Sequence, residues 1–452
     1  MRKTLSLIII SVITSIVVAQ PNKFVLKAHA IGGKVIPINK TLESINPNPT
    51  LGGELAIEFP SWGEYPWQQY LGEPTLGVGF IGLNLGDNKI LGQSFAIYPY
   101  LLIDIVKLPH FELNWKVGAG LSFFNKTYDR VYDKYNPETD PNWSYYGATC
   151  NNLIGSIVNV YLTTGANFNF QITKQFGLHA DFGYMHMSNG SVLQPNGGIN
   201  ILYASVGASY LLETINNQSK YNKQKEFAPQ SHRWNINITG SGGYRELYYG
   251  DNKGYGVGSL HIGAIYNICN WYAIGGGFDA FYDGVFNQQG GTRLEGLTPE
   301  QRQEQLKHTQ FGRYVILNED LSNKFRVGIS INNEFMIGRI TAILDWGVYL
   351  YDPIRLAYYT DDTYKYKYEK RPILYKYDIK KEDGWNYIRL GVRCRVWDNL
   401  YVQTAVKTHL SKAEMIEWGV GYQIPLKQEK IDNDALKYKS QNKKQQRLYI
   451  NY

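Results

Sequence analysis

Residues 111–123 read Phe-Glu-Leu-Asn-Trp-Lys-Val-Gly-Ala-Gly-Leu-Ser-Phe, and this stretch indicates the fold class. Every odd-numbered residue in it is apolar, and every even-numbered residue is polar or glycine. Side chains of a β-strand point alternately to its two faces, so the stretch predicts a strand with one apolar and one polar face. A secreted β-sandwich can alternate in the same way. The length of the run and a polar face rich in Gly, Asn and charge favour a membrane β-barrel, with the polar face in the lumen.

The same alternation recurs in two sets of eight strands. The first set is expected near residues 23–37, 51–60, 75–86, 93–107, 110–124, 156–171, 175–189 and 198–212. The second set is expected near 232–245, 254–267, 271–285, 324–337, 339–351, 385–396, 400–410 and 414–425. An even number of strands brings both ends of a barrel to one side of the membrane. The connection 61–74 is overlong for a turn on that side.

We therefore predict an all-β chain of two tandem eight-stranded outer-membrane barrels, with one sixteen-stranded barrel as the alternative. The first barrel is expected over residues 21–213 and the second barrel-like domain over 232–426, followed by a basic polar tail at 427–452. Residues 214–231 between them are rich in Asn, Gln and Lys and contain Pro229, which predicts a linker. This linker is longer than the turns expected elsewhere on that side, which favours two barrels.

The N-terminus predicts export. Residues 1–20 resemble a secretory signal peptide, because Arg2 and Lys3 precede an apolar run and small residues stand before Gln20. The run is short for a membrane anchor helix, which is the alternative, and no later run is long enough to span a bilayer as a helix. Aromatic residues make up 14% of the chain, with 37 Tyr, and 45 Gly are present. This composition suits a bacterial outer-membrane barrel.

Charge and cysteine content exclude several classes of function. The formal net charge is +7, and the tail from Lys427 has seven Lys or Arg against three acids. Nucleic acid is not an expected partner of an exported chain, so we interpret the tail as a solvated end. Cys150, Cys269 and Cys394 lie far apart and form neither a metal-binding spacing nor a disulfide framework. We expect no metal and no cofactor.

A polar cluster ends the seventh predicted strand. His186 and Ser188 are two residues apart and share the lipid-facing parity of Leu178 and Tyr184. Asn200 has the same parity at the adjacent end of the eighth strand. A histidine beside a serine can act as a base toward its hydroxyl, and the Asn and Gly that follow could supply oxyanion donors. Polar groups on a lipid face are costly unless they are paired or functional. The alternative is a polar hairpin tip at the level of the lipid headgroups.

These residues resemble the signature of a known family. His186-Met187-Ser188-Asn189-Gly190, followed by Gln194-Pro195-Asn196-x-Gly, is similar to the signature of the lipid A 3-O-deacylases, the PagL-type acyloxyacyl hydrolases. The resemblance covers roughly residues 22–213. It implies an eight-stranded outer-membrane barrel with an active site that faces the membrane. By this resemblance Ser188 would be the nucleophile, His186 the base, and Asn189 and Gly190 the oxyanion donors.

One position departs from the family pattern, which has a glutamate where this chain has Asn200. An asparagine can accept a hydrogen bond from the imidazole and orient it, but it cannot stabilise imidazolium by charge. Where the acid of a serine protease triad becomes Asn, kcat falls by about 10⁴, through the wrong tautomer. Asp181 has lumen-facing parity, so the acids that could reach the site are those of the long loop, Asp129, Asp133, Glu138 and Asp140. The chain is therefore either a slower serine esterase or a variant in which Asn200 serves well.

The second half shows no site of its own. His409-Leu410-Ser411 repeats the His-x-Ser spacing near Glu414 and Glu417, but its parity points into the lumen, so we expect it to stabilise a strand end. The arginines at positions 389, 393 and 395 are expected to give that lumen a basic lining.

The sequence thus predicts a serine ester hydrolase that removes an ester-linked acyl chain from lipid A or a related glycolipid. Its catalytic residues would be His186, Ser188 and Asn200, and its partners the outer membrane and the lipopolysaccharide of the outer leaflet. The rival hypothesis is a non-enzymatic barrel, either a porin-like channel or a surface-interaction protein. The missing acid at position 200 and a second half without a visible site suit that rival.

Overall fold

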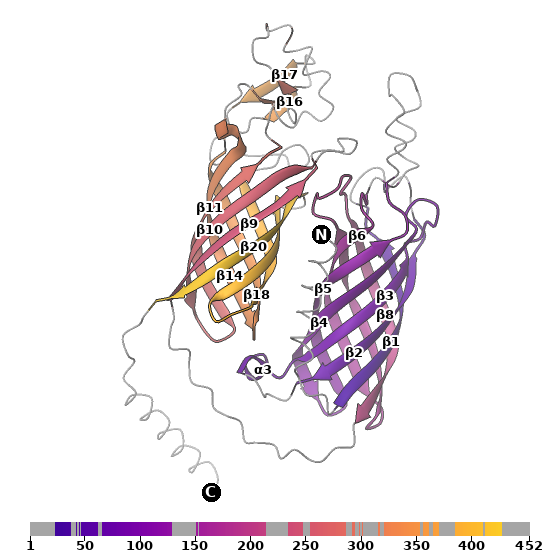
Figure 1. The fold of residues 1–452 in the computed structure, drawn as a ribbon. Coiled ribbons are helices and arrows are strands. Elements are labelled where there is room, and N and C mark those ends of the chain that lie inside the picture. The colour runs from indigo at the N-terminus through magenta and orange to yellow at the C-terminus, as the bar shows by residue number, and fades with distance from the viewer. Residues whose placement is uncertain are drawn as a thin grey trace, which may run out of the picture.

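A computed structural model shows two closed antiparallel barrels of eight strands each (Figure 1). It describes residues 23–37, 42, 45, 47–61, 66–128, 151, 153–213, 234–246, 254–285, 292–293, 298, 301, 315–316, 321–352, 356–360, 365–369, 385–409 and 412–426. The predicted signal peptide, the linker 214–231, the tail 427–452 and the four loop acids lie outside the described residues. Among the described helices, none is both long and apolar enough to cross a membrane.

The first barrel closes on itself, because β8 pairs with β1 along thirteen residues from Lys23↔Glu213 to Val35↔Ile201. Its strands are β1 (Lys23–Val35), β2 (Thr50–Pro60), β3 (Thr75–Asn84), β4 (Gln93–Leu108), β5 (Phe111–Phe124), β6 (Val158–Gln171), β7 (Phe176–Ser188) and β8 (Ile199–Glu213). The overlong connection between β2 and β3 contains a short helix, α3 (Pro66–Tyr70).

The second barrel closes through pairing of β9 with β20. Its strands are β9 (Trp234–Arg245), β10 (Tyr255–Asn267), β11 (Tyr272–Asp283), β14 (Phe325–Ile337), β15 (Ile340–Tyr351), β18 (Asn386–Arg395), β19 (Leu400–His409) and β20 (Lys412–Pro425). Outside the barrel wall lie two small pairs, β12 (Thr292–Arg293) with β13 (Val315–Ile316) and β16 (Leu356–Thr360) with β17 (Lys365–Glu369), and the 3₁₀ turn η2 (Leu321–Lys324). Tandem eight-stranded barrels are thus confirmed, and the sixteen-stranded alternative is wrong, because β8 pairs with β1 rather than with β9.

The alternation of β5 divides its side chains between lipid and lumen as predicted. Trp115 and Phe123 are exposed on the outside, at 49% and 40%, whereas Lys116 and Ser122 are buried inside. Lys116 Nζ lies 3.2 Å from Glu54 Oε1 on β2 and 3.3 Å from Asp181 Oδ2 on β7. Buried charges persist only when they are paired, so this lysine holds three strands of the wall together across the lumen.

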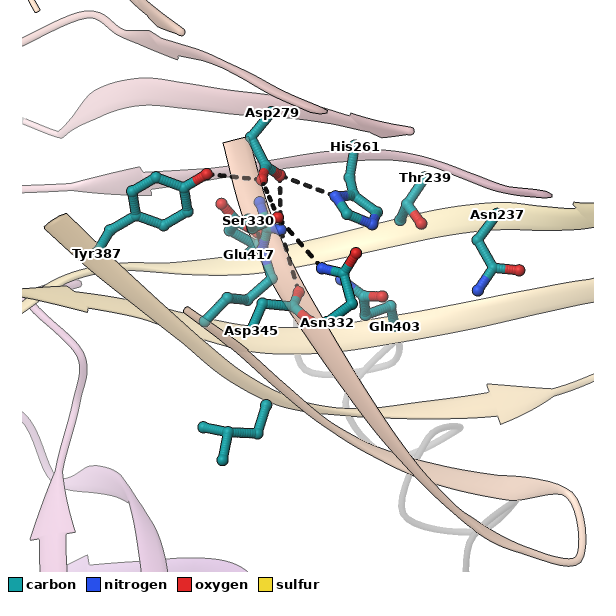
Figure 2. Close-up of polar contacts among 12 residues, drawn as sticks. Asn237, Thr239, His261, Asp279, Ser330, Asn332, Asp345, Tyr387, Gln403 and Glu417 are labelled. Carbon is teal, nitrogen blue, oxygen red and sulfur yellow. Dashed lines mark hydrogen bonds and ion pairs between the residues drawn. The ribbon is translucent and has the colours of Figure 1, made fainter. Parts of the chain in front are cut away.

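The lumen of the second barrel contains a dense polar network centred on Asp279 (Figure 2). Its carboxylate accepts hydrogen bonds from His261 Nδ1 at 2.9 Å, Ser330 Oγ at 2.7 Å and the Tyr387 hydroxyl at 2.7 Å. Arg389 Nη1 adds a fourth contact at 2.8 Å. Side chains therefore fill this lumen, as they do in barrels of eight strands, which argues against a porin-like aqueous channel.

The prediction that arginines give the second lumen a basic lining is wrong, because acidic side chains neutralise them. Arg389 and Arg393 do point inward, but Arg389 pairs with Asp279, Asp345 and Glu417, and Arg393 pairs with Glu334. Strand parity places a side chain on a face but does not show what the opposite strands bring to meet it. His409 is buried in the lumen as expected, where its Nε2 lies 2.8 Å from the Tyr349 hydroxyl. Ser411 lies outside the described residues.

The Lys116 cluster gives a testable prediction about the stability of the first barrel. We expect Lys116→Met to lower the free energy of unfolding by about 3–5 kcal/mol, because Glu54 and Asp181 would be left as buried carboxylates without their cation. Lys89→Met, at an exposed loop position, is the control and should change it by less than about 0.5 kcal/mol. Urea unfolding in detergent micelles measures both. Equal stability of the two variants would contradict a structural role for Lys116.

Candidate active site

The polar residues at the outer ends of β7 and β8 lie on the outward face of the first barrel. His186 on β7 stands directly opposite Asn200 on β8 in the strand register. Ser188 follows on the same face of β7, one position beyond the last β7–β8 pair, Met187↔Ile199. Met185 and Met187, on either side of His186 in the strand, point inward and are fully buried. The period of two in a β-strand thus brings a histidine, a serine and an asparagine together on the lipid side.

A continuous chain of hydrogen bonds joins the three side chains. Ser188 Oγ lies 2.9 Å from His186 Nε2, and His186 Nδ1 lies 2.6 Å from Asn200 Oδ1. All three side chains are half-buried. Since the asparagine oxygen can only accept, Nδ1 must carry the proton, which leaves Nε2 free to accept the hydroxyl proton of Ser188. This is the tautomer that a general base toward serine requires.

Tyr184 adds a fourth side chain to this series of hydrogen bonds. It was not identified from the sequence as a member of the site. Its hydroxyl donates to Asn200 Oδ1 at 2.5 Å. The bond orients the amide, because an amide turned around would present its NH₂ group to the imidazole and favour the wrong tautomer. A signal was present in the sequence, since Tyr184, His186 and Ser188 share one face of one strand. From the sequence alone, an aromatic residue of that face is interpreted as part of the lipid-facing surface.

The loop after Ser188 engages one of the two oxyanion donors expected from the resemblance. Asn189 donates its backbone N–H to Asn196 Oδ1 at 2.9 Å, and its side-chain amide donates to Ser156 Oγ at 3.0 Å and to the Leu193 carbonyl at 2.8 Å. Among the described residues, none accepts the N–H of Gly190. Of the two oxyanion donors expected from the sequence, Gly190 is the one that is not already engaged, and Asn189 holds the loop together.

Glycines allow the loop to approach the side chains of the candidate site closely. Gly190 has φ of 61° and Gly198 has φ of 71°, which are left-handed values that residues with a Cβ adopt at a cost. A Cβ on Gly198 would also lie 3.1 Å from His186 Cε1. The N–H of Gly198 donates to the Leu153 carbonyl at 3.1 Å, so the segment before β6 supports this side of the loop.

No acid joins the site among the described residues. Asp181, the nearest carboxylate in β7, points into the lumen as predicted, where it contacts Lys116 at 3.3 Å and accepts from Asn167 Nδ2. The described residues also contain no cluster of three or more His, Cys, Asp or Glu side chains that could hold a metal ion. What the arrangement can do is attack an acyl carbonyl with an activated hydroxyl, with a neutral amide in the third position.

Models of acyl hydrolase families match both halves of the chain. A family model described as "Lipid A 3-O-deacylase (PagL)" matches residues 51–209. A second, described as "Acyloxyacyl hydrolase, C-terminal domain", matches residues 233–375 and 371–427. No curated protein sequence matches the chain.

Solved structures of outer-membrane barrels are similar to part of the chain. Neisserial surface protein A shares 10% sequence identity over 42% of this chain and 97% of its own, with a TM-score of 0.27. The outer membrane enzyme PagL shares 17% over 42% of this chain and 99% of its own, with a TM-score of 0.25. The Ail protein of Yersinia pestis shares 10% over 42% and 98%, with a TM-score of 0.24.

The bond from Tyr184 to Asn200 can be tested through the reactivity of Ser188. We expect Tyr184→Phe to slow labelling of Ser188 by a fluorophosphonate probe about three- to tenfold, the rate equivalent of one hydrogen bond worth about 1 kcal/mol. Tyr210→Phe removes an exposed hydroxyl from the outward face of β8 and serves as the matched control. If both variants label at the wild-type rate, the tyrosine hydroxyl does not orient Asn200.

Proposed function

Because the chain belongs to the PagL-type acyloxyacyl hydrolase family, we propose that it is a serine ester hydrolase that removes an ester-linked acyl chain from lipid A or a related glycolipid. The protein is a hydrolase of the outer membrane by family and fold. The observation that carries the finer proposal is the hydrogen-bonded chain Ser188–His186–Asn200 on the outward face of the barrel.

The first half of the reaction would transfer the acyl group to the protein. Ser188 Oγ attacks the ester carbonyl while His186 Nε2 takes the hydroxyl proton. The resulting imidazolium then gives that proton to the departing sugar oxygen as the C–O bond breaks. An acyl-serine remains, and the deacylated glycolipid leaves.

The second half would release the fatty acid. A water molecule attacks the acyl-serine carbonyl, and His186 Nε2 takes its proton and returns it to Ser188 Oγ. In both halves negative charge develops on the carbonyl oxygen, and the N–H of Gly190 is the donor that we assign to it. Asn189 contributes by holding the loop in shape through its contacts with Asn196, Ser156 and Leu193.

Asn200 and Tyr184 together would take the place of the family's acid. The asparagine oxygen keeps Nδ1 protonated and the ring aligned, and the tyrosine hydroxyl keeps that oxygen facing the ring. Neither group carries a charge to stabilise the imidazolium. The site should therefore work by orientation, without the charge stabilisation of the imidazolium that an acid supplies.

The outward position of the site supports a membrane lipid as substrate. Leu178, Phe182 and Leu202 surround the approach along β7 and β8 and are 46–55% exposed on the lipid side. An acyl chain can lie against these residues without leaving the bilayer, while its ester group meets Ser188 at the end of the strand. A soluble ester would gain nothing from this apolar surface.

Removing the nucleophile or the base should abolish turnover. We expect Ser188→Ala and His186→Ala each to reduce fatty-acid release to the background rate, because the nucleophile or its proton acceptor is lost. Mass spectrometry of lipid A from cells that express each variant measures the acyl chains that remain. Ser209→Ala on β8 is the control, and heat-modifiable gel mobility reports that each barrel still folds. Full deacylation by Ser188→Ala would leave the non-enzymatic rival as the better hypothesis.

The role of Asn200 can be tested by replacing it with an aspartate, which adds a negative charge and keeps the length of the side chain. We expect Asn200→Asp to raise kcat, because an aspartate oxygen can accept from both His186 and Tyr184 and also stabilise the imidazolium. Asn200→Leu, which has no acceptor, should lower kcat, because nothing on β8 then holds the proton on Nδ1 of His186. A fall in Asn200→Asp as deep as that in Asn200→Leu would show that the site requires a neutral amide.

A further inference from the structure

The loop that follows Ser188 is bound by residues of the second barrel. Ser191 Oγ donates to the carbonyl of Ala413 on β20 at 2.7 Å, and the carbonyl of Ser191 accepts the N–H of Glu246 at 3.1 Å. The carboxylate of Glu246, just after β9, accepts the N–H of Gln194 at 2.8 Å. Three hydrogen bonds thus join two loop residues of the first barrel, Ser191 and Gln194, to Ala413 and Glu246 of the second.

An apolar contact reinforces these bonds at the residue assigned to the oxyanion. A Cβ on Gly190 would lie 2.4 Å from Ile416 Cγ1, so the backbone of Gly190 packs directly on that side chain of β20. Ile416 is 7% exposed, and Glu246 and Ser191 are each 4% exposed. Water is therefore largely excluded from the contact, which strengthens a hydrogen bond to a carboxylate.

The loop needs this support because its conformation is unfavourable. Gly190 and Ser191 are consecutive left-handed residues, with φ of 61° and 67°. For a residue with a Cβ such as Ser191, that conformation costs roughly 1–2 kcal/mol. The hydroxyl and the carbonyl of Ser191 both bond to the second barrel. The bonds to Ala413 and Glu246 offset the cost and select one conformation of the loop.

The barrels also meet near the end of the molecule that carries α3 (Figure 1). A Cβ on Gly338, in the turn between β14 and β15, would lie 3.2 Å from the indole of Trp67 in α3. Contacts at two separated points restrict rocking of one barrel against the other more than a single contact can. The second barrel is therefore placed to act as a fixed support for the loop.

We propose that the second barrel is a positioning element of the active site, with Glu246, Ala413 and Ile416 holding the loop 189–194 so that the Gly190 N–H serves the oxyanion. This inference rests on the proposed function and assigns a role to the half of the chain that has no site of its own. Glu246 acts through Gln194 and Ser191 and does not touch the substrate. Its loss should therefore affect turnover and leave substrate binding, which depends on the lipid face of β7 and β8, unchanged.

The test compares variants of the full chain in proteoliposomes that contain lipid A. We expect Glu246→Ala and Ile416→Ala to lower kcat about 10²-fold with KM unchanged, since a displacement of about 1 Å in a catalytic group costs that much. Glu246→Gln keeps an oxygen acceptor for the Gln194 N–H and should stay close to the wild type. Asp398→Ala, an exposed carboxylate in the β18–β19 turn, is the control that should change nothing.

Hydrogen exchange gives a readout that does not depend on catalysis. Amide exchange in a peptide spanning residues 189–196 should rise in Glu246→Ala and remain as in the wild type in Glu246→Gln and Asp398→Ala. If Glu246→Ala also exposes the strands of the second barrel, Ser191→Ala carries the test, because it breaks the contact with Ala413 from the first barrel's side.

The outcomes separate this inference from the proposed function. Wild-type turnover and wild-type exchange in both Glu246→Ala and Ser191→Ala, with Ser188→Ala inactive, would overturn the positioning role and leave the hydrolase standing. A wild-type protein that releases no fatty acid would overturn both. A rise in KM without a fall in kcat would show that the second barrel binds substrate, which also contradicts the positioning role.

Discussion

A barrel wall in lipid must satisfy every backbone N–H and C=O within its own sheet, because hydrocarbon offers no hydrogen-bond partner. Here the condition is met twice, by closure of β8 on β1 and of β20 on β9. Closure leaves each strand only two faces, one toward lipid and one toward the lumen. Chemistry on lipid must use the outward face, and it must lie at a strand end, where the ladder stops and loop backbone becomes available. Ser188 stands at that point, one residue past the last β7–β8 pair.

The same constraint explains how much of the structure could be predicted from the sequence. Strict alternation in segments such as 111–123 determines both the strand and its two faces, so the sixteen strands of the wall lie within a few residues of their predicted ranges. It also identifies His186, Ser188 and Asn200 as neighbours, since cross-strand position follows from register. Parity carries no information about contacts across a lumen. The arginines of β18 were therefore predicted as a basic lining, although Asp279, Glu334 and Glu417 meet them from other strands.

Contacts between the two barrels were equally invisible in the sequence. Glu246 follows a strand end and is one acid among many, and only the fold brings it to Gln194, fifty-two positions earlier in the chain. Tyr184 is a different case, because its place on the strand was predicted and its role was not. An aromatic residue on a lipid face is ordinarily a packing residue. Its hydroxyl joins the candidate site because Asn200 Oδ1 lies 2.5 Å from it on the next strand.

The asparagine at position 200 and the contact of the second barrel with the loop are related through the proposed mechanism. A carboxylate beside lipid costs more free energy than an amide, so in the proposed site Asn200 with Tyr184 would orient His186 at a smaller cost than an acid. In the proposed mechanism the imidazolium lacks an anionic partner, so more of the stabilisation would come from the oxyanion donor, which we propose is the Gly190 N–H. That donor lies in a loop whose left-handed residues are unfavourable in isolation. Fusing a second barrel to the first places Glu246 and Ile416 against the loop at a high effective concentration, so the support does not depend on an encounter between separate molecules in the membrane.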